Sequence, residues 1–221
     1  MHRTSVRLGD AGSDARLRPD GVARLLQDVA TDDWATSGIA DTATWVVRRT
    51  SFRRVGDRWP LMGDPLELTT FCSGTGAAWA ERRTNVAIDG ELVIEAVALW
   101  VPIDPAGRPL RLREEFFSVY GESASGRKVP GRVPGPGDPP REAARRRWEL
   151  RRSDLDVVGH VNNAALWLPM VEIAEGPISS ASMIHHLPVE GGDEVELCAL
   201  PGRLWLVVAG HVAVSASFAG P

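Results

Sequence analysis

The sequence predicts an α+β fold of two tandem units, each an antiparallel sheet wrapped around one central helix, packed together as an internal pseudo-dimer. Two observations support this fold class. A glycine- and proline-rich stretch at residues 121–140 separates two halves of the 221-residue chain. Each half repeats one order of elements, a helix with one apolar face followed by strands of alternating polarity. A long antiparallel sheet around each helix would bury that apolar face.

The two helices are predicted from apolar residues that recur at helical spacing. The first helix is predicted over residues 19–34, with Pro19 near its start, where proline is favoured. Its apolar face would carry Val22, Leu25, Leu26, Val29 and Ala30. The second helix is predicted over residues 163–175, and Pro169 should kink it or shift its start. Its apolar face would carry Leu166, Met170 and Ile173.

Strand-like segments follow each helix. They cover residues 44–52, 66–72, 77–88 and 92–103 in the first half, and 194–200, 204–209 and 211–218 in the second. Asp89 and Gly90 form a hairpin turn signal between the last two strands of the first half. Both halves also carry a Gly-Asp-x-(Leu/Val)-Glu-Leu turn and strand, which begins at Gly63 and at Gly192. This shared unit supports the tandem repeat.

The linker sets the predicted domain boundaries. Residues 121–140 are half glycine and proline, and we expect neither a helix nor a central strand there. The chain is therefore divided into an N-terminal unit at residues 1–120, a linker at 121–143 and a C-terminal unit at 144–221.

The composition excludes several classes of protein. The net charge of −4 gives no indication of nucleic acid binding. The apolar runs are far shorter than a membrane span requires, and the N-terminus lacks the apolar core of a signal peptide, so a cytoplasmic location is expected. Cys72 and Cys198 stand alone in strand-like segments, which favours reduced, buried thiols. The adjacent His185 and His186 lack the ligand spacing of a metal site, so no metal or cofactor is predicted.

One segment of ten residues, from Asp154 to Asn163, carries the clearest chemistry. It places the carboxylate of Asp156 and the imidazole of His160 four positions apart, just before the second predicted helix. A carboxylate, an imidazole and helix N-terminal amides are the parts that hydrolysis of an activated acyl group requires. A structural interpretation stays open, because Asp154 or Asp156 could cap a turn and Asn162 could cap the helix.

Several segments together resemble the acyl-ACP thioesterases, the plant enzymes and their bacterial relatives, over nearly the whole chain apart from the linker. The segments are residues 45–49, 59–64 and 99–104 in the first half, and 154–163 with Gly192-Asp193 in the second. The resemblance implies a tandem double-hotdog fold. It also implies a cytoplasmic enzyme of fatty acid biosynthesis that hydrolyses an acyl thioester, most simply acyl-ACP, to a free fatty acid. Acyl carrier protein or coenzyme A would then carry the substrate.

The resemblance assigns site residues, with two departures. Asp156 and His160 match the aspartate and histidine of the family, but Val158 stands where the family has an asparagine. The family also has an acidic residue on the strand that begins near residue 183, and this chain has no carboxylate there before Glu190. Glu172, on the second helix, is the simplest replacement, and His185 and His186 are further candidates.

Each residue has an expected role in this chemistry. Asp156 would activate water or attack the thioester directly, and His160 would position Asp156 or the water. The backbone amides of Asn162, Asn163 and Ala164 would hold the developing oxyanion.

The resemblance also divides labour between the halves. The first hotdog would hold the acyl chain, in a tunnel for which Trp34, Trp45 and Trp100 are the candidates. The loop at Gly12-Ser13-Asp14 corresponds to the catalytic segment, but no histidine follows it. Recurring arginine pairs could guide an acidic carrier protein or could simply form a solvated face: Arg48-Arg49, Arg53-Arg54, Arg82-Arg83, Arg145-Arg146-Arg147 and Arg151-Arg152.

Two other functions stay open. A degenerate hotdog that binds an acyl chain or acyl-ACP without hydrolysis would account for Val158 and for the missing strand carboxylate. Hydratase chemistry is disfavoured, because its motif separates the aspartate and histidine by one more residue and places Asn-Pro between them. A monomer is compatible with the tandem repeat, and a homodimer could form through an exposed sheet edge.

Overall fold

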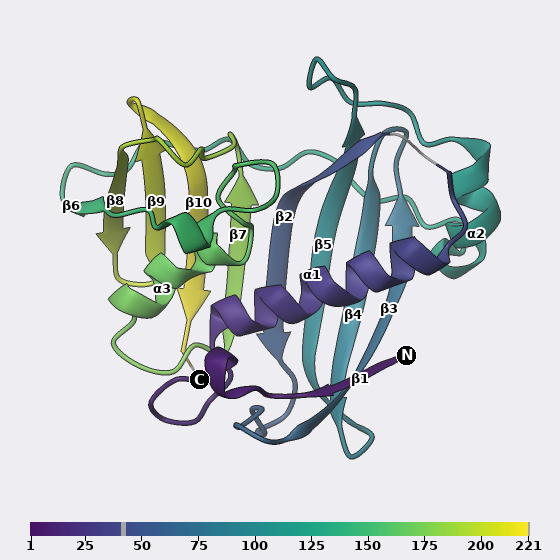
Figure 1. Cartoon of the computed structure of the whole chain (residues 1–221), viewed down its shortest axis with the longest axis horizontal. Coiled ribbons are helices and arrows are strands. Elements are labelled where there is room, and N and C mark those ends of the chain that lie inside the picture. Colours follow the sequence, from purple (N-terminus) through teal and green to yellow (C-terminus); the bar gives the residue numbers. More distant parts are fainter. Residues whose placement is uncertain (41–42, 221) are drawn as a thin grey trace.

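A computed structural model describes residues 1–40 and 43–220, and within them the strands form one antiparallel sheet of ten strands (Figure 1). The order across the sheet is β1-β3-β4-β5-β2-β7-β10-β9-β8-β6. The strands are β1 (His2–Ser5), β2 (Thr44–Arg54), β3 (Pro65–Thr75), β4 (Ala80–Ile88), β5 (Glu91–Ile103), β6 (Ala144–Trp148), β7 (Ser180–His185), β8 (Val195–Leu200), β9 (Arg203–Val208) and β10 (His211–Ala219).

The two halves of the chain meet in the middle of this sheet. The first half supplies β1 to β5 and the second supplies β6 to β10, and the seam is the antiparallel pair of β2 and β7, where Thr50 lies opposite Met183. The α+β fold of two tandem units is thus confirmed. The Asp89-Gly90 turn is also confirmed, because both residues have positive φ, 53° and 79°, as a tight hairpin turn requires.

Helix α1 (Pro19–Thr36) lies across one face of the sheet, while α3 (Leu168–Ile173) lies over the strands of the second half (Figure 1). One apolar core joins them, because Val22 and Val29 of α1 belong to the same buried cluster as Met170 of α3 and Met183 of β7. Burying these faces against one continuous sheet stabilises both halves together.

The first turn of α1 carries a buried ion cluster. Pro19 occupies the first helical turn as predicted, and Asp20 beside it is 1% exposed. The Asp20 carboxylate accepts hydrogen bonds from Arg18 at 2.8 and 2.9 Å and from Arg24 at 2.7 Å. Burial disfavours its charge, but the two guanidinium groups outweigh burial and hold the Asp20 pKa below its usual value.

The prediction of no helix in residues 121–140 is wrong at its start. Helix α2 (Glu114–Ala124) runs through residues 121–124, which contain one glycine and no proline. Phe116, Tyr120 and Ala124 recur every four residues and are buried, so this face holds the helix against β3. The glycine- and proline-rich composition takes effect only after Ser125, whose φ of 48° ends the helix.

The second predicted helix is shorter than expected. Residues 163 and 164 are not helical, a 3-10 turn η3 occupies Ala165–Trp167, and α3 covers only Leu168–Ile173. Pro169 lies in the first turn of α3, where its missing amide N–H costs nothing. Pro169 therefore shifts the helix start and does not kink the helix.

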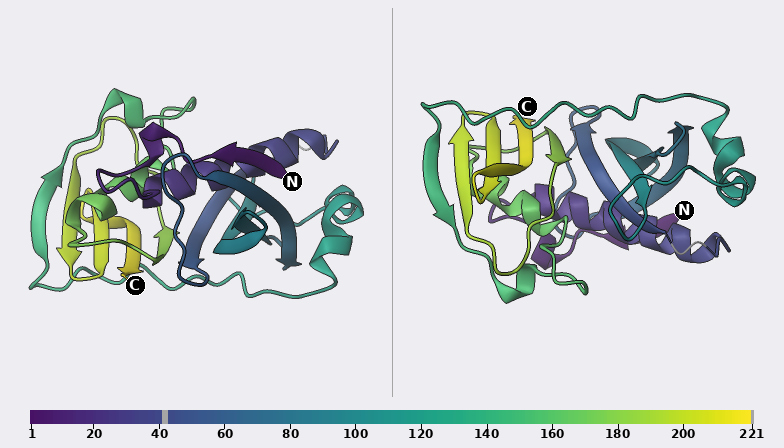
Figure 2. Two further views of the ribbon diagram at one scale, coloured as in Figure 1. Left: turned by 90° about the horizontal axis from the view of Figure 1, so that it is seen from below. Right: turned by 90° about the horizontal axis from the view of Figure 1, so that it is seen from above.

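The linker runs along the side of the sheet opposite to α1, as both views of Figure 2 show. Its beginning is fixed to the first half, because Trp79 donates its indole N–H to the Val129 carbonyl at 2.9 Å and Arg127 binds Glu81 at 2.5 Å. Cys72 and Cys198 are free and buried as predicted. In the described ranges, none of the helices is long and apolar enough to cross a membrane.

Candidate functional site

The predicted catalytic segment forms a compact loop closed at both ends by backbone pairing. Leu155 pairs with Val161, and the Asp156 N–H donates to the His160 carbonyl at 2.8 Å. Gly159 makes the turn possible with a φ of 86°. Gly191 lies against the loop, where a Cβ atom would come within 2.6 Å of Leu155. The loop geometry therefore depends on both glycines.

The Asp156 carboxylate caps this loop from inside. Its Oδ1 accepts the backbone N–H of Val158 at 3.0 Å and that of His160 at 3.1 Å. Asp154 acts similarly one turn earlier, accepting the Arg151 N–H at 2.8 Å. The prediction that Asp154 or Asp156 caps a turn is thus confirmed for both aspartates. Asp156 is only half-buried, and the bonds described leave its Oδ2 available to a substrate or a water.

Of the three amides predicted to bind the oxyanion, two have partners inside the protein. The Asn162 N–H donates to the Asp154 carbonyl at 2.8 Å, and the Ala164 N–H donates to the Asn162 side chain at 2.8 Å. The expected set of three donors is therefore wrong for this loop. The backbone N–H of Asn163 has no hydrogen bond to the described residues and remains the candidate donor for the oxyanion.

His160 is exposed, and its ring has no hydrogen-bond partner among the described residues. In the backbone, His160 pairs with Glu190 in an antiparallel bridge. Residues directly opposite one another in such a bridge present their side chains on the same face, with Cβ atoms about 5 Å apart. The Cβ atoms of Glu190 and His160 therefore lie on the same face, and sequence analysis did not assign Glu190 to the site. The pairing could not be predicted from the sequence, because the two residues are thirty positions apart. It depends on how the loop after β7 returns to the catalytic loop.

The remaining predicted residues are more widely spread. Val158 is 69% exposed at the tip of the loop. Glu172 is exposed and lines a recess of about 540 Å³ between α3 and the loop around Asp14, which neither Asp156 nor His160 lines. The resemblance makes that loop the first-half counterpart of the catalytic segment, so Glu172 faces the counterpart loop and not the loop that carries His160.

His185 and His186 lie at the end of β7, away from the loop tip. His185 is buried, its Nε2 has no hydrogen-bond partner among the described residues, and burial together with Arg48 and His186 lowers its pKa to about 4. His186 lies within 2.9 Å of the Ser215 hydroxyl, and burial and Arg48 lower its pKa too. Both rings are therefore neutral near pH 7.

A cavity of about 280 Å³ lies in the first half, between α1, α2 and the sheet, and we call it the chamber. All three tunnel candidates line it: Trp34, Trp45 and Trp100. Phe116 of α2 stacks on Trp45 with ring centroids 5.6 Å apart, and Trp34 lies 5.5 Å from Trp45. These tryptophans were predicted as tunnel residues from different segments of the sequence, and the fold places them around one apolar cavity.

A second cavity, of about 30 Å³, borders the chamber, and we call it the neck. Arg82 and Trp100 line both the neck and the chamber, and Asn163 and Trp167 also line the neck. Its volume admits only a water-sized group. A chain that passes from Asn163 into the chamber therefore has to displace side chains in the neck.

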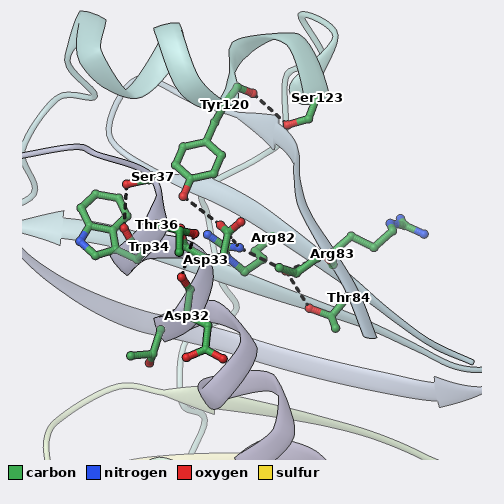
Figure 3. A network of polar contacts seen from close by, with 12 residues as sticks. Asp32, Asp33, Trp34, Thr36, Ser37, Arg82, Arg83, Thr84, Tyr120 and Ser123 are labelled. Carbon is green, nitrogen blue, oxygen red and sulfur yellow. Dashed lines mark hydrogen bonds and ion pairs between the residues drawn. The ribbon is translucent and has the colours of Figure 1, made fainter. Parts of the chain in front are cut away.

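A polar network borders the chamber where α1, β4 and α2 meet (Figure 3). Asp33 Oδ2 accepts hydrogen bonds from Arg82 at 2.7 Å and from the Tyr120 hydroxyl at 2.9 Å. Arg82 also donates to Thr70 at 3.2 Å, and its guanidinium lies 5.6 Å from the centre of the Tyr120 ring. The network ties α2 to α1 and leaves a cation at the boundary of the chamber and the neck.

Comparison with known families gives matches along most of the chain. The acyl-ACP thioesterase N-terminal domain matches residues 1–120, and the acyl-ACP thioesterase C-terminal domain matches residues 137–200. An uncharacterised protein of Mycobacterium tuberculosis is 26% identical over 183 residues, which cover 78% of this chain and 70% of that protein. The chloroplast acyl-[acyl-carrier-protein] hydrolase FATB2 of Cuphea viscosissima is 26% identical over 72% of this chain, and the chain spans 43% of its length.

Solved structures share the fold at low identity. A putative oleoyl thioesterase from Lactobacillus plantarum superposes with a TM-score of 0.84 at 15% identity, covering 98% of this chain and 93% of that one. The 12:0-ACP thioesterase from Umbellularia californica gives a TM-score of 0.78 at 18% identity, covering 98% and 95%. At these identities the likeness extends to the arrangement of both halves and not to individual site residues.

Proposed function

Because the chain belongs to the acyl-ACP thioesterase family, we propose that it hydrolyses an acyl thioester, with acyl-ACP as the substrate and a free fatty acid as the product. The observation that carries this proposal is the chamber lined by tryptophans, together with the neck that borders it and has Asn163 of the catalytic loop in its lining. The thioester carbonyl would lie beside Asp156 and His160, and the acyl chain would occupy the space around Trp34, Trp45 and Trp100. We place this reaction in cytoplasmic fatty acid metabolism.

In the proposed mechanism, Asp156 has the role of general base or nucleophile. Its Oδ1 is held by two loop amides, which leaves Oδ2 to take a proton from water or to attack the carbonyl carbon. His160 would position the water or Asp156, and the Asn163 amide would stabilise the oxyanion. The thiolate leaves readily, so protonation of the leaving group is the least demanding step.

The test of this proposal is thiol release from acyl-ACP and acyl-CoA substrates of increasing chain length. Release from acyl-ACP that saturates at low substrate concentration would support it, and a preference for acyl-CoA would change the carrier and keep the reaction. The exposed Arg151 and Arg152 next to the loop suit the phosphate of either carrier.

A second candidate function is a binding protein that no longer hydrolyses its ligand. Val158 supports it, since the exposed valine side chain at the loop tip can neither donate nor accept a hydrogen bond. Tight binding of acyl-ACP without thiol release on any chain length would favour this function over the enzyme.

Replacing Val158 with asparagine is expected to raise the hydrolysis rate about tenfold, which is less than the roughly 10²–10³ that a full oxyanion donor contributes. Val158 is 69% exposed, so the change should cost little stability. Val157→Asn is the matched control, because Val157 is its fully exposed neighbour on the same loop. Equal rates in both variants would show that the position no longer contacts the reacting group.

Replacing Glu190 with glutamine is expected to lower the hydrolysis rate about tenfold, because Glu190 lies opposite His160 in the backbone bridge. The parallel variant is Glu172→Gln, which removes the carboxylate predicted from the sequence. A larger loss in the Glu172 variant would assign the missing carboxylate to α3. A loss in the Glu190 variant alone would assign it to the loop after β7.

A further inference from the structure

The loop at residues 12–16, which we call the counterpart loop, repeats the backbone hydrogen bonds of the catalytic loop. The Gly12 N–H donates to the Arg16 carbonyl at 2.8 Å, as the Asp156 N–H donates to the His160 carbonyl at 2.8 Å. The surrounding contacts recur in matched pairs: Leu17 N–H to the Pro60 carbonyl at 2.9 Å and Val161 N–H to the Val189 carbonyl at 2.7 Å, Arg18 N–H to the Asp10 carbonyl at 2.9 Å and Asn162 N–H to the Asp154 carbonyl at 2.8 Å, and the bridges of Arg16 with Leu61 and of His160 with Glu190. Each residue of the counterpart loop therefore has an equivalent in the catalytic loop.

The counterpart loop lacks the reactive groups proposed for the catalytic loop. Gly12 takes the place of Asp156 and brings no carboxylate, and Pro19 takes the place of Asn163 and has no N–H for an oxyanion. Arg16 takes the place of the histidine and is a permanent cation. The loop thus keeps the shape of the catalytic loop without a base or an oxyanion donor, and a thioester held there would not be hydrolysed by the proposed mechanism.

The recess of about 540 Å³ lies against the counterpart loop, and its volume is within the range of small-molecule sites. Arg16 lines it with a side chain that is 27% exposed and lies 5.7 Å from the centre of the Trp59 ring. Its Nε is 4.0 Å from Asp14 Oδ2, too far for a hydrogen bond, and the guanidinium has no closer polar partner among the described residues. Arg18 also lines the recess, but its guanidinium is bound to Asp20 and to two backbone carbonyls. Arg16 is therefore the cation whose N–H groups are available to a ligand.

The recess also offers acceptors and an apolar wall. Glu172 and Glu175 line it from α3 and the turn after α3, and within the part of the chain that the structure describes neither carboxylate has a hydrogen bond or an ion pair. Leu168, Val171 and Ile178 add apolar side chains. An anionic ligand would meet the two carboxylates, and a cationic ligand would meet the guanidinium. A neutral chain with both carbonyl oxygens and N–H groups fits charged groups of both signs.

We propose that the recess binds the pantetheine arm of an acyl carrier without hydrolysing it. Pantetheine is a neutral, flexible chain with amide groups, so its carbonyls can accept hydrogen bonds from Arg16 and its N–H groups can donate to Glu172 and Glu175. This inference rests on the proposed function, in which the catalytic loop, with the same backbone, holds an acyl-pantetheine thioester. It deepens that function by adding a second carrier site, separate from the site of hydrolysis.

The experiment is a titration of pantetheine into the full chain, followed by the backbone amide shifts in NMR spectra. Residues 12–16 report the recess and residues 156–160 report the catalytic loop, so the two sites are measured separately. Saturable shifts at residues 12–16 are expected. Their absence would overturn the proposal.

Variants locate the binding. Arg16→Met removes the charged donors and keeps an unbranched side chain, and it is expected to weaken binding at residues 12–16 about tenfold. Arg7→Met is the matched control, because Arg7 is an exposed arginine outside the recess. Val171→Phe narrows the recess from α3 and should also weaken the binding, with Arg16 intact. The same spectra show whether each variant is folded, and wild-type affinity in both Arg16→Met and Val171→Phe would contradict the proposal.

Other ligands test the chemical class. A fatty acid or an alkylamine that saturates residues 12–16 at a lower concentration than pantetheine would show that the recess selects a charged head group, and the proposal would be wrong. Coenzyme A and holo-acyl carrier protein present the same arm. Saturation of residues 12–16 by either of them supports the site, and the tighter of the two is its source of pantetheine.

Thiol release from acyl-ACP, measured on the same preparation, separates this site from the proposed function. Thiol release together with shifts at residues 12–16 supports both proposals. Thiol release without those shifts contradicts the second site and keeps the thioesterase. Shifts at residues 12–16 without thiol release keep the pantetheine site and contradict the thioesterase.

Discussion

Replacing Asp156 with asparagine is expected to lower thioester hydrolysis by about 10²–10⁴-fold while the loop keeps its conformation. Asparagine has an oxygen at the position of Oδ1, so it can still accept the N–H groups of Val158 and His160 that Asp156 binds at 3.0 and 3.1 Å. It cannot take a proton from water or form an anhydride. The measurement is steady-state thiol release, with binding of the free fatty acid as a check on the chamber.

Asp156→Ala is the companion variant, because alanine removes both the charge and the loop cap. A cap of this kind contributes about 1 kcal/mol, so the alanine variant should also unfold at lower urea concentration. If the asparagine variant keeps full activity while the alanine variant loses it, Asp156 acts only as a loop cap. Equal loss in both, with stability reduced only in alanine, would separate the chemical role from the structural one.

The observed capping role of Asp156 and its proposed chemical role show why sequence alone left its assignment open. An aspartate two and four residues before backbone amides of a tight turn is typical of a cap, and the same spacing to His160 is typical of the catalytic segment in the family. The cap uses Oδ1, and the proposed chemistry would use Oδ2. The hydrogen bonds from Val158 and His160 to Oδ1 are seen only in the structure. Residue type and spacing therefore propose Asp156 for both roles, and they do not say which oxygen would serve each role.

The fold was largely predictable because its main elements have clear periodicity. The strands after α1 were located within a few residues, since alternation marks their buried faces. Periodicity missed β1, β6 and α2 at the margins of the sheet, and it also missed the central β7, which was expected only from the resemblance, near residue 183. β6 has four exposed residues out of five, among them Arg145, so no apolar alternation marks it. Its existence depends on hydrogen bonds to β8, which local sequence does not encode.

The site was less predictable because its parts come from distant segments. Glu190 lies opposite His160 in a backbone bridge between two loops, and the tryptophans that line the chamber come from α1, β2 and β5. The short α3 also changed the site, because the predicted helix start at residue 163 would have left the amides of Asn162 and Ala164 free. Instead, the Asn162 side chain closes its own turn on Ala164 at 2.8 Å. Local side-chain to backbone bonds of this kind compete with helix initiation.

His185 leads to a second large effect, on stability and its dependence on pH. This histidine lies on β7 opposite Val214 of β10, next to the seam with β2. It is 8% exposed, and burial, then Arg48 and His186, lower its pKa from 6.5 to about 4. Between these two pKa values the His185 ring is neutral in the folded protein and protonated in the unfolded chain, so folding in this pH range requires the loss of a proton.

The sign of the effect follows from proton linkage. Above pH 6.5 the ring is neutral in both states, and His185 adds no pH dependence. Between about pH 6.5 and pH 4 the unfolded state binds more protons, so the free energy of unfolding falls as the pH falls. Below about pH 4 both states are protonated and the loss is complete. Lowering the His185 pKa from 6.5 to about 4 corresponds to a change of roughly 3 kcal/mol in the free energy of unfolding.

His185→Leu is expected to remove most of this pH dependence. Leucine is of similar volume, does not titrate and leaves no unpaired ring nitrogen in the core. Urea unfolding of the wild type should show a free energy lower by roughly 2–3 kcal/mol near pH 4.5 than near pH 7.5, and the variant a much smaller difference. His186→Gln is the control, because His186 is less buried and bonded to Ser215, so its removal should leave most of the slope in place. A slope that survives in His185→Leu would mean that the acid sensitivity arises from other groups, and that β7 tolerates a charged histidine at the seam.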